Sequence, residues 1–224
     1  MRNSIVMLIF VLMLILQGCS PKNPPAPSHT VAAPMYLKLL IIDYDPELPT
    51  RDNVKMGDYM GSEPVEENIY DLVDRLHSAS HGILNYTVEY MYVNEFPRHN
   101  DGFQVDRVQF PDLWDEAEWD LFRTIEEKGS YFDYTYFIEQ FNLIKRRNRG
   151  EIDEVWFISE FANGSETVMV GRGAYEINGS LIKADCKPFR INQIARHRFD
   201  TPLENLGHSA EAIMSNVSCV MTKP

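Results

Sequence analysis

Three side chains near the end of the chain could bind a metal ion together. Glu204, His208 and Glu211 follow one another at intervals of four and three residues. On a helix, at about 100° per residue, the three side chains lie within an arc of roughly 60°. Imidazole nitrogen and carboxylate oxygen are both ligands of divalent cations such as zinc. The spacing therefore predicts a candidate metal site at Glu204, His208 and Glu211.

The residues around this triad predict an amphipathic helix. Thr201 is a good N-cap, Pro202 suits the first helical position, and Glu204 completes a Thr-x-x-Glu capping box. A second stripe of the helix is apolar and comprises Leu203, Leu206, Ala210, Ile213, Met214 and Val217. Capping alone also explains Glu204, a solvated face explains Glu211, and packing or exposure explains His208. Metal binding and these structural roles are alternatives at this point.

Residues 204–208 read Glu-Asn-Leu-Gly-His and resemble the His-Glu-x-Gly-His active helix of zincin metallopeptidases, with two changes. Glu204 stands where that family has its first zinc histidine, Asn205 stands where it has the catalytic glutamate, and His208 matches. In the family the glutamate acts as general base on the zinc-bound water, and an amide is not basic enough to do so. The resemblance therefore implies a peptidase-like domain that is not an active peptidase by that mechanism.

The resemblance has other consequences. Zincins take another ligand from beyond the motif helix, and this sequence stops at Pro224, so Glu211 would be the substitute within reach. A truncated relative that lacks the other half of its cleft is a further alternative, and it predicts exposed apolar surface around Met214 and Val217. The stretches 80–102, 151–179 and 203–214 are also similar to a group of secreted bacterial and fungal proteins of unassigned function.

The elements that precede this helix alternate between strands and helices. The nearly continuous apolar run 36–43 predicts a buried strand, and apolar residues from Val65 to Leu76 recur at helical spacing. Residues 83–93 alternate between two faces, as in a strand. Helices are predicted from Pro111 and over 134–141.

A strand pair is predicted next. Residues 151–160 have a strand pattern, Asn163-Gly164 is a hairpin signal, and 167–170 is the expected return strand, continued after a glycine break by 174–177. The basic cluster Lys145, Arg146, Arg147 and Arg149 is interpreted as a solvated loop that offsets nearby carboxylates, with an anion or surface-polymer contact as the alternative.

This order of elements resembles the zincin amino-terminal subdomain, whose mixed sheet places an edge strand beside the cleft. We therefore predict an α+β fold: a zincin-like mixed sheet with flanking helices and a C-terminal motif helix. It would form a single globular domain over residues 35–224.

Residues 1–18 predict a lipoprotein signal peptide. Arg2 precedes an uncharged apolar run at 5–16, which as a helix would cover roughly 18 Å of a hydrocarbon core about 30 Å thick. The run ends in Leu16-Gln17-Gly18-Cys19, which resembles the lipobox of bacterial lipoproteins. The resemblance implies diacylation of Cys19, for example with palmitate, and an anchor in the membrane facing outside the cytoplasm. Ser20 in place of aspartate favours the outer membrane if the source is Gram-negative.

Residues 19–34 predict a lipidated cysteine followed by a Pro-rich linker. Beyond the cytoplasmic membrane Cys186 and Cys219 are candidates for a disulfide, although spacing alone does not show that they meet. With 33 acidic against 21 basic residues the net charge is −12, which excludes a broad cationic surface for nucleic acid.

The function that these features predict is a membrane-anchored lipoprotein of the cell envelope with a peptidase-like, catalytically inactive binding domain. Its partner would be a peptide, a polymer or a protein, bound along an edge strand and the cleft. No cofactor is expected in that case. The alternative is a metal-dependent hydrolase that uses Glu204, His208 and Glu211 with a divalent metal such as zinc.

Overall fold

The structure is a computed structural model that describes residues 33–62, 64–115, 131–160, 167–177, 179–196, 204, 207 and 208. The unit treated below is Pro34–Pro224. The predicted signal peptide, Cys19 and nearly all of the linker lie outside the described residues. Among the residues that were described, no helix is long and apolar enough to cross a membrane.

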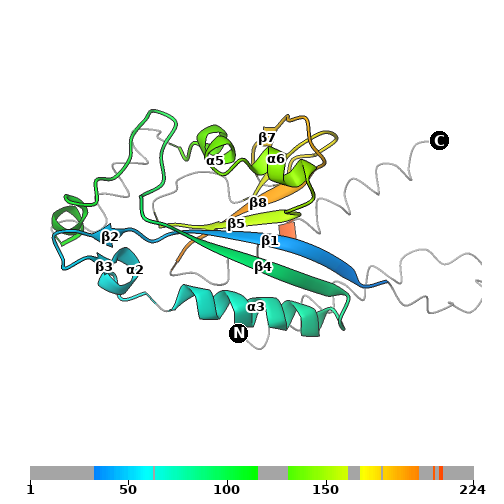
Figure 1. Cartoon of the computed structure of the whole chain (residues 1–224), viewed down its shortest axis with the longest axis horizontal. Helices are drawn as coiled ribbons and strands as arrows, with labels where there is room; N and C mark the ends of the chain where they lie inside the picture. The colour runs from blue at the N-terminus through cyan, green and yellow to red at the C-terminus, as the bar shows by residue number, and fades with distance from the viewer. Residues whose placement is uncertain are drawn as a thin grey trace, which may run out of the picture. The chain divides into compact units, whose positions relative to one another are not determined.

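The centre of the described domain is a six-stranded mixed sheet in the order β4-β1-β5-β8-β6-β7 (Figure 1). Its strands are β1 (Met35–Tyr44), β4 (Leu84–Val93), β5 (Glu154–Ile158), β6 (Thr167–Val170), β7 (Leu181–Ile182) and β8 (Phe189–Ile194). β4, β1, β5 and β8 run parallel, β6 is antiparallel to β8, and β7 is parallel to β6. The predicted mixed sheet with flanking helices is confirmed.

Helices cover both faces of this sheet (Figure 1). α3 (Val65–Ala79) buries its apolar stripe against one face, where Leu39 and Ile41 of β1 also point. α5 (Tyr134–Gln140) and α6 (Leu143–Asn148) cover the other face together with Leu40 and Ile42. β1 is therefore buried on both sides, which explains why its sequence is a continuous apolar run and not an alternating one.

A smaller layer packs beside the carboxyl end of β1. β2 (Glu47–Leu48) and β3 (Val54–Lys55) form a two-stranded antiparallel sheet, and α2 (Met56–Tyr59) follows directly. Leu48 and Met56 of this layer form a separate apolar cluster with Phe96, Val105 and Phe110 from the segment after β4. This layer brings Lys55 and Gly57 close to the end of β1.

Most of the predicted local elements are confirmed within one or two residues. The expected strands at 36–43 and 83–93 and helices at 65–76 and 134–141 correspond to β1, β4, α3 and α5. The helix predicted from Pro111 is observed over 110–115, and the rest of the predicted span lies outside the described residues. These elements had strong periodic patterns, because each buries one well-defined face.

The predicted hairpin is wrong. β5 and β6 are not neighbours, because β8 lies between them and pairs with both. β8 contributes Ile191 to one core and Ile194 to the other, whereas β6 contributes Val168 and Val170 to one core alone. β8 therefore lies between β5 and β6 with side chains in both cores, and the turn signal at Asn163-Gly164 does not determine which strand pairs with β5. Residues 174–177 are not a strand either, since the chain turns after Gly171.

The basic cluster is not a loop. Lys145, Arg146 and Arg147 lie on α6, which Asn142 begins in a left-handed conformation. Its expected pairing with carboxylates is confirmed: Arg146 contacts Glu89, Arg147 contacts Asp153, and Arg149 contacts Glu151. The local sequence was read as a loop because it has no apolar stripe of its own.

Candidate functional site

Three of the five motif residues lie in the described part of the chain. Glu204, Gly207 and His208 are helical, and Glu204 Oε1 lies 4.0 Å from His208 Nε2. The predicted proximity of these two side chains is confirmed, and both are partly exposed. Asn205 and Glu211 lie outside the described residues, and the part of the chain that is described contains no group of three metal-binding side chains.

Only one cysteine of the candidate disulfide, Cys186, lies among the described residues. Cys186 is buried in the core that contains Val170 and Phe189, and it forms no disulfide with another described residue. Cys219 lies outside the described residues. The bridge between the two cysteines therefore stays a prediction.

A pocket lies at the carboxyl end of β1, where the order of the strands reverses. The chain leaves β1 through α3 to β4 on one side, and it later returns to β5 on the other side of β1. In sheets of this kind, ligands bind outside the carboxyl end of the strand at which the order reverses. A pocket of about 490 Å³ occupies this place, lined by Asp43, Asp45, Lys55, Gly57, Asp58, Ser62, Pro64, Val65, Glu66, Glu67, Tyr70, Tyr92 and Arg196.

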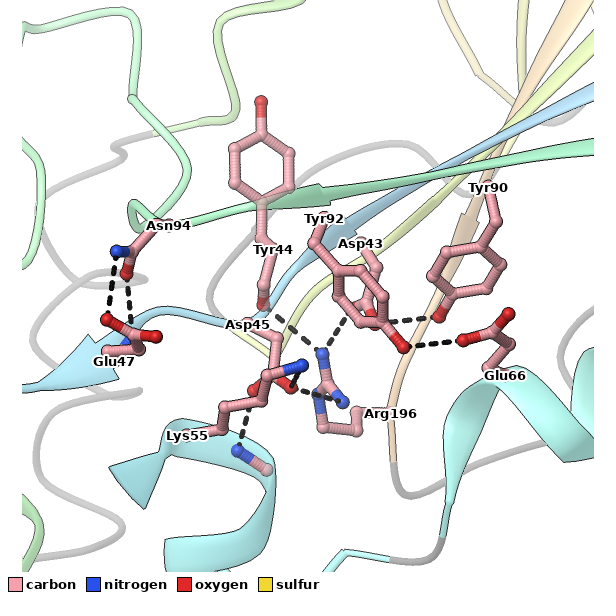
Figure 2. A network of polar contacts seen from close by, with 11 residues as sticks. Asp43, Tyr44, Asp45, Glu47, Lys55, Glu66, Tyr90, Tyr92, Asn94 and Arg196 are labelled. Atoms are coloured by element: carbon pink, nitrogen blue, oxygen red, sulfur yellow. Dashed lines mark hydrogen bonds and ion pairs between the residues drawn. The ribbon is translucent and has the colours of Figure 1, made fainter. Parts of the chain in front are cut away.

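The floor of the pocket is a buried network around Arg196, which is 3% exposed (Figure 2). Its guanidinium contacts Asp43 and lies 3.6 Å from Asp45 Oδ2. Asp45 Oδ1 also accepts a hydrogen bond of 2.8 Å from the backbone N–H of Gly57. A Cβ at Gly57 would lie 2.8 Å from Arg196 Nη1, so glycine is needed for this close approach.

Asp43 has the most perturbed carboxyl group of the pocket. Burial raises the pKa of Asp43 to about 6, although Arg196 and a 2.7 Å hydrogen bond from Tyr90 Oη both favour the ionised form. Burial and the neighbouring Asp43 carboxylate also raise the pKa of Tyr90 well above its usual range. A carboxyl group that titrates near pH 6 inside a pocket marks a candidate binding site.

The mouth of the pocket combines aromatic rings and carboxylates. Tyr92 is 50% exposed, and its hydroxyl donates a hydrogen bond of 2.7 Å to Glu66 Oε2 (Figure 2). Lys55 Nζ lies 3.8 Å from the centre of the Tyr92 ring and 4.0 Å from Asp45 Oδ2. The site therefore has the geometry to hold an ammonium group between a ring and a carboxylate.

The outer edge of β4 ends beside this mouth, at Tyr92. Ile83 and Val93 direct their carbonyls toward β1, where Met35 N and Asp45 N donate to them. Because residues of a parallel strand alternate between its two neighbours, the even-numbered residues of β4 direct their N–H and C=O groups outward. Leu84 uses both groups, with Ser80 and His77 as partners. From Tyr86 to Tyr92, no residue that the structure describes pairs with this outer edge.

The opposite edge of the sheet is covered. β7 pairs with the outer side of β6, where Met169 N donates to Ser180 O at 3.3 Å and Gly171 N donates to Ile182 O at 3.0 Å. Among the described residues, only the short part of β6 before Met169 has no strand on its outer side. The long accessible edge within the described chain is therefore β4.

The sequence patterns did not reveal the pocket. Asp45-Pro46 was interpreted as a turn that ends the first strand, and Arg196 had no motif at all. Two acidic residues at the carboxyl end of a doubly buried strand, Asp43 and Asp45, were the available signal, because carboxyl ends of such strands form ligand sites. No family model, curated protein or solved structure is similar enough to this chain to count as a match.

Proposed function

We propose that the protein is a lipid-anchored, extracytoplasmic binding protein whose domain takes up an extended peptide segment and does not cleave it. The observation that carries the proposal is the outer edge of β4, a ten-residue strand with unpaired outward backbone groups from Tyr86 to Tyr92 among the described residues. Such an edge binds extended chains through main-chain hydrogen bonds.

The finer fold assignment, a zincin-like domain, is part of this proposal. Four parallel strands with the antiparallel β6 beside them are consistent with the mixed sheet that the resemblance implies. The proximity of Glu204 and His208 on one helical turn also supports it. With Asn205 at the position of the general base, we expect a peptidase-like body that binds without hydrolysis.

A proline substitution tests binding at β4. Val88→Pro removes one outward N–H and leaves the hydrogen bonds to β1 in place, which an edge strand tolerates. Val88→Ala is the matched control, because it loses the same side chain and keeps the donor. Phage-displayed random peptides that bind the wild-type protein should bind Val88→Ala and not Val88→Pro. Equal binding to both variants, or no enrichment of any peptide by the wild-type protein, would contradict the proposal.

The lipid anchor is tested separately at Cys19. Cells that express the wild-type chain should incorporate labelled palmitate into it and retain it in the membrane fraction. Cys19→Ala should abolish the label and release the protein from the membrane, because a single cysteine carries the acyl chains. Labelling that persists in Cys19→Ala would show that the lipobox interpretation is wrong.

The metal-dependent hydrolase is the second candidate, favoured by the 4.0 Å approach of Glu204 to His208. With Glu211 these residues could hold a divalent metal such as zinc, which would supply a Lewis acid. Protein purified without added metal and its His208→Ala variant distinguish the two functions. Stoichiometric metal that disappears in the variant, together with peptide cleavage abolished by chelation, would replace our proposal with the enzyme.

A further inference from the structure

We propose that the β4 edge selects extended peptides that carry a lysine or arginine, and that the pocket at the end of β1 receives this cationic side chain. The inference rests on the proposed function, because it places the peptide on the same edge. It adds the class of ligand and the residues that recognise it.

α3 packs on the face of the sheet next to β4, and two contacts fix its position along that strand. Glu66 accepts the hydrogen bond from Tyr92 near the end of β4, and His77 Nδ1 lies 3.1 Å from the carbonyl of Leu84 at its beginning. Residues four apart on a helix share a face. Tyr70 and Asp74 therefore lie between these contacts, on the stripe that borders the edge, and both are exposed.

Acidic groups flank the edge on both faces of the sheet. Glu66 and Asp74 lie on the α3 side. On the other side Glu89 of β4 keeps 53% of its side chain exposed even though Arg146 contacts it. A strand added to β4 would place its alternate side chains next to Glu66 and Asp74 on one face and next to Glu89 on the other. Basic side chains are therefore complementary to the edge, and acidic ones are repelled.

The same charges disfavour a second copy of this chain as the occupant. Pairing of β4 with β4 across a twofold axis would bring identical acidic rows together. Each chain carries a net charge of −12, so long-range repulsion acts in the same direction. A separate peptide of positive charge has neither obstacle.

The pocket lies at the end of this edge. Tyr92 belongs to β4, and Glu66 lies beside it on α3, yet both also line the pocket. A peptide that follows β4 toward its carboxyl end therefore reaches the mouth of the pocket. A side chain at that point enters between the Tyr92 and Tyr70 rings and the carboxylates of Glu66 and Glu67.

The chemistry of the pocket favours a cation. Two basic groups, Lys55 and Arg196, face five carboxylates, which are those of Asp43, Asp45, Asp58, Glu66 and Glu67. Arg196 is already engaged with Asp43 and Asp45. Lys55 lies against the Tyr92 ring and 4.0 Å from Asp45 Oδ2. The position of Lys55 also demonstrates that an ammonium fits against this ring. A lysine or arginine of the ligand completes the charge balance at the mouth.

Three synthetic peptides test the inference with the full chain in detergent. They share one alternating Val/Thr sequence and carry lysine, glutamine or glutamate at the same alternate positions, with a fluorescent label for polarisation measurements. We expect the lysine peptide to bind at least about tenfold more tightly than the glutamate peptide, with an affinity that falls as salt is added.

Substitutions locate the selectivity. Glu66→Gln combined with Glu67→Gln should weaken binding of the lysine peptide about tenfold and reduce its preference over the glutamine peptide, because two carboxylates are lost. Glu139→Gln on α5 is the matched control on the opposite face, and it should leave binding unchanged. Thermal melts of each variant verify that the domain is folded.

The outcomes separate the inference from the proposed function. Binding of all three peptides with equal affinity, lost in Val88→Pro, overturns the cation selectivity and leaves the β4 edge as the binding site. Lysine-peptide binding that is insensitive to the Glu66 and Glu67 substitutions overturns the pocket as the selecting site. Absence of binding by any peptide overturns both.

Discussion

The two edges of the sheet differ in how they are protected. The β6 edge is closed by β7 and the residue before it, where Ser180 O and Ile182 O accept hydrogen bonds from Met169 N and Gly171 N. The β4 edge has no strand beside it in the described chain, and acidic side chains such as Glu66 and Glu89 border it instead. Charge near an exposed edge discourages indiscriminate pairing between strands.

This difference separates a structural edge from a binding edge. Pairing with β7 satisfies the outward backbone groups of β6 permanently, so the β6 edge has few hydrogen-bonding groups left for a ligand. Charge leaves the backbone of β4 available while it repels most extended chains, including further copies of this one. An edge of this kind admits only partners with a complementary charge pattern.

The largest expected effect is at Arg196, which holds the pocket at the end of the β4 edge. Arg196→Met leaves Asp43 and Asp45 buried without their cation, so the free energy of unfolding should fall by about 3–5 kcal/mol near pH 7. Urea unfolding measures this loss. The control Arg172→Met removes an exposed ion pair with Asp185 and should cost less than about 1 kcal/mol.

The same variant has a predicted pH dependence. The pKa of Asp43 is raised from 3.8 to about 6 in the folded protein, so the folded state binds this proton more tightly than the unfolded chain. The contribution of Asp43 to the free energy of unfolding therefore falls as pH rises between these values. Without Arg196 the pKa of Asp43 rises further, so the deficit of Arg196→Met should shrink from about pH 7 to about pH 5. A deficit that grows on acidification would contradict this assignment.

A substitution at Gly171 is expected to disturb the closed edge, where β7 covers β6. Its φ is +119°, and an added Cβ would lie 2.9 Å from Lys187 O and 3.0 Å from Cys186 O. Gly171→Ala should therefore lower the free energy of unfolding by about 2–4 kcal/mol and loosen β7. Gly173→Ala is the control, since its φ is +69° but nothing lies within 4 Å, and it should cost about 1 kcal/mol. Equal losses in the two variants would show that the close approach at Gly171 is not a constraint.

The smallest expected effect is a difference in amide hydrogen exchange along β4, which is measured on the wild-type protein. Amide hydrogen exchange should be faster at Tyr86, Val88 and Tyr90, whose N–H groups point outward, than at Thr87 and Glu89, which donate to β1. Addition of a saturating lysine peptide should slow exchange at the first three amides alone. Protection at those amides without ligand would show that the β4 edge is already occupied.

Sequence patterns predicted the local elements and missed their pairing. The apolar period of α3 and the alternation of β4 were sufficient to place both within three residues. The hairpin prediction for β5 and β6 failed because a turn signal reports only that the chain reverses. Which strand lies beside which depends on contacts between segments that are distant in the sequence.

The sequence likewise predicted the local contact among the candidate site residues and missed the distant one. Helical spacing correctly placed Glu204 near His208, because that contact is local and follows from 3.6 residues per turn. The contact between Asp43 and Arg196 joins residues 153 positions apart. No periodicity connects two positions at such a separation.

By itself, then, the sequence determined which segments are strands and helices, which of their faces are apolar, and how acidic the chain is. The tertiary structure alone decided that β4 lies at an open edge, that β8 separates β5 from β6, and that Arg196 neutralises two aspartates beneath the pocket. The physical reason is that local patterns depend on backbone geometry, which repeats along the chain. Strand order and buried ion pairs depend instead on burial and charge shared between distant segments.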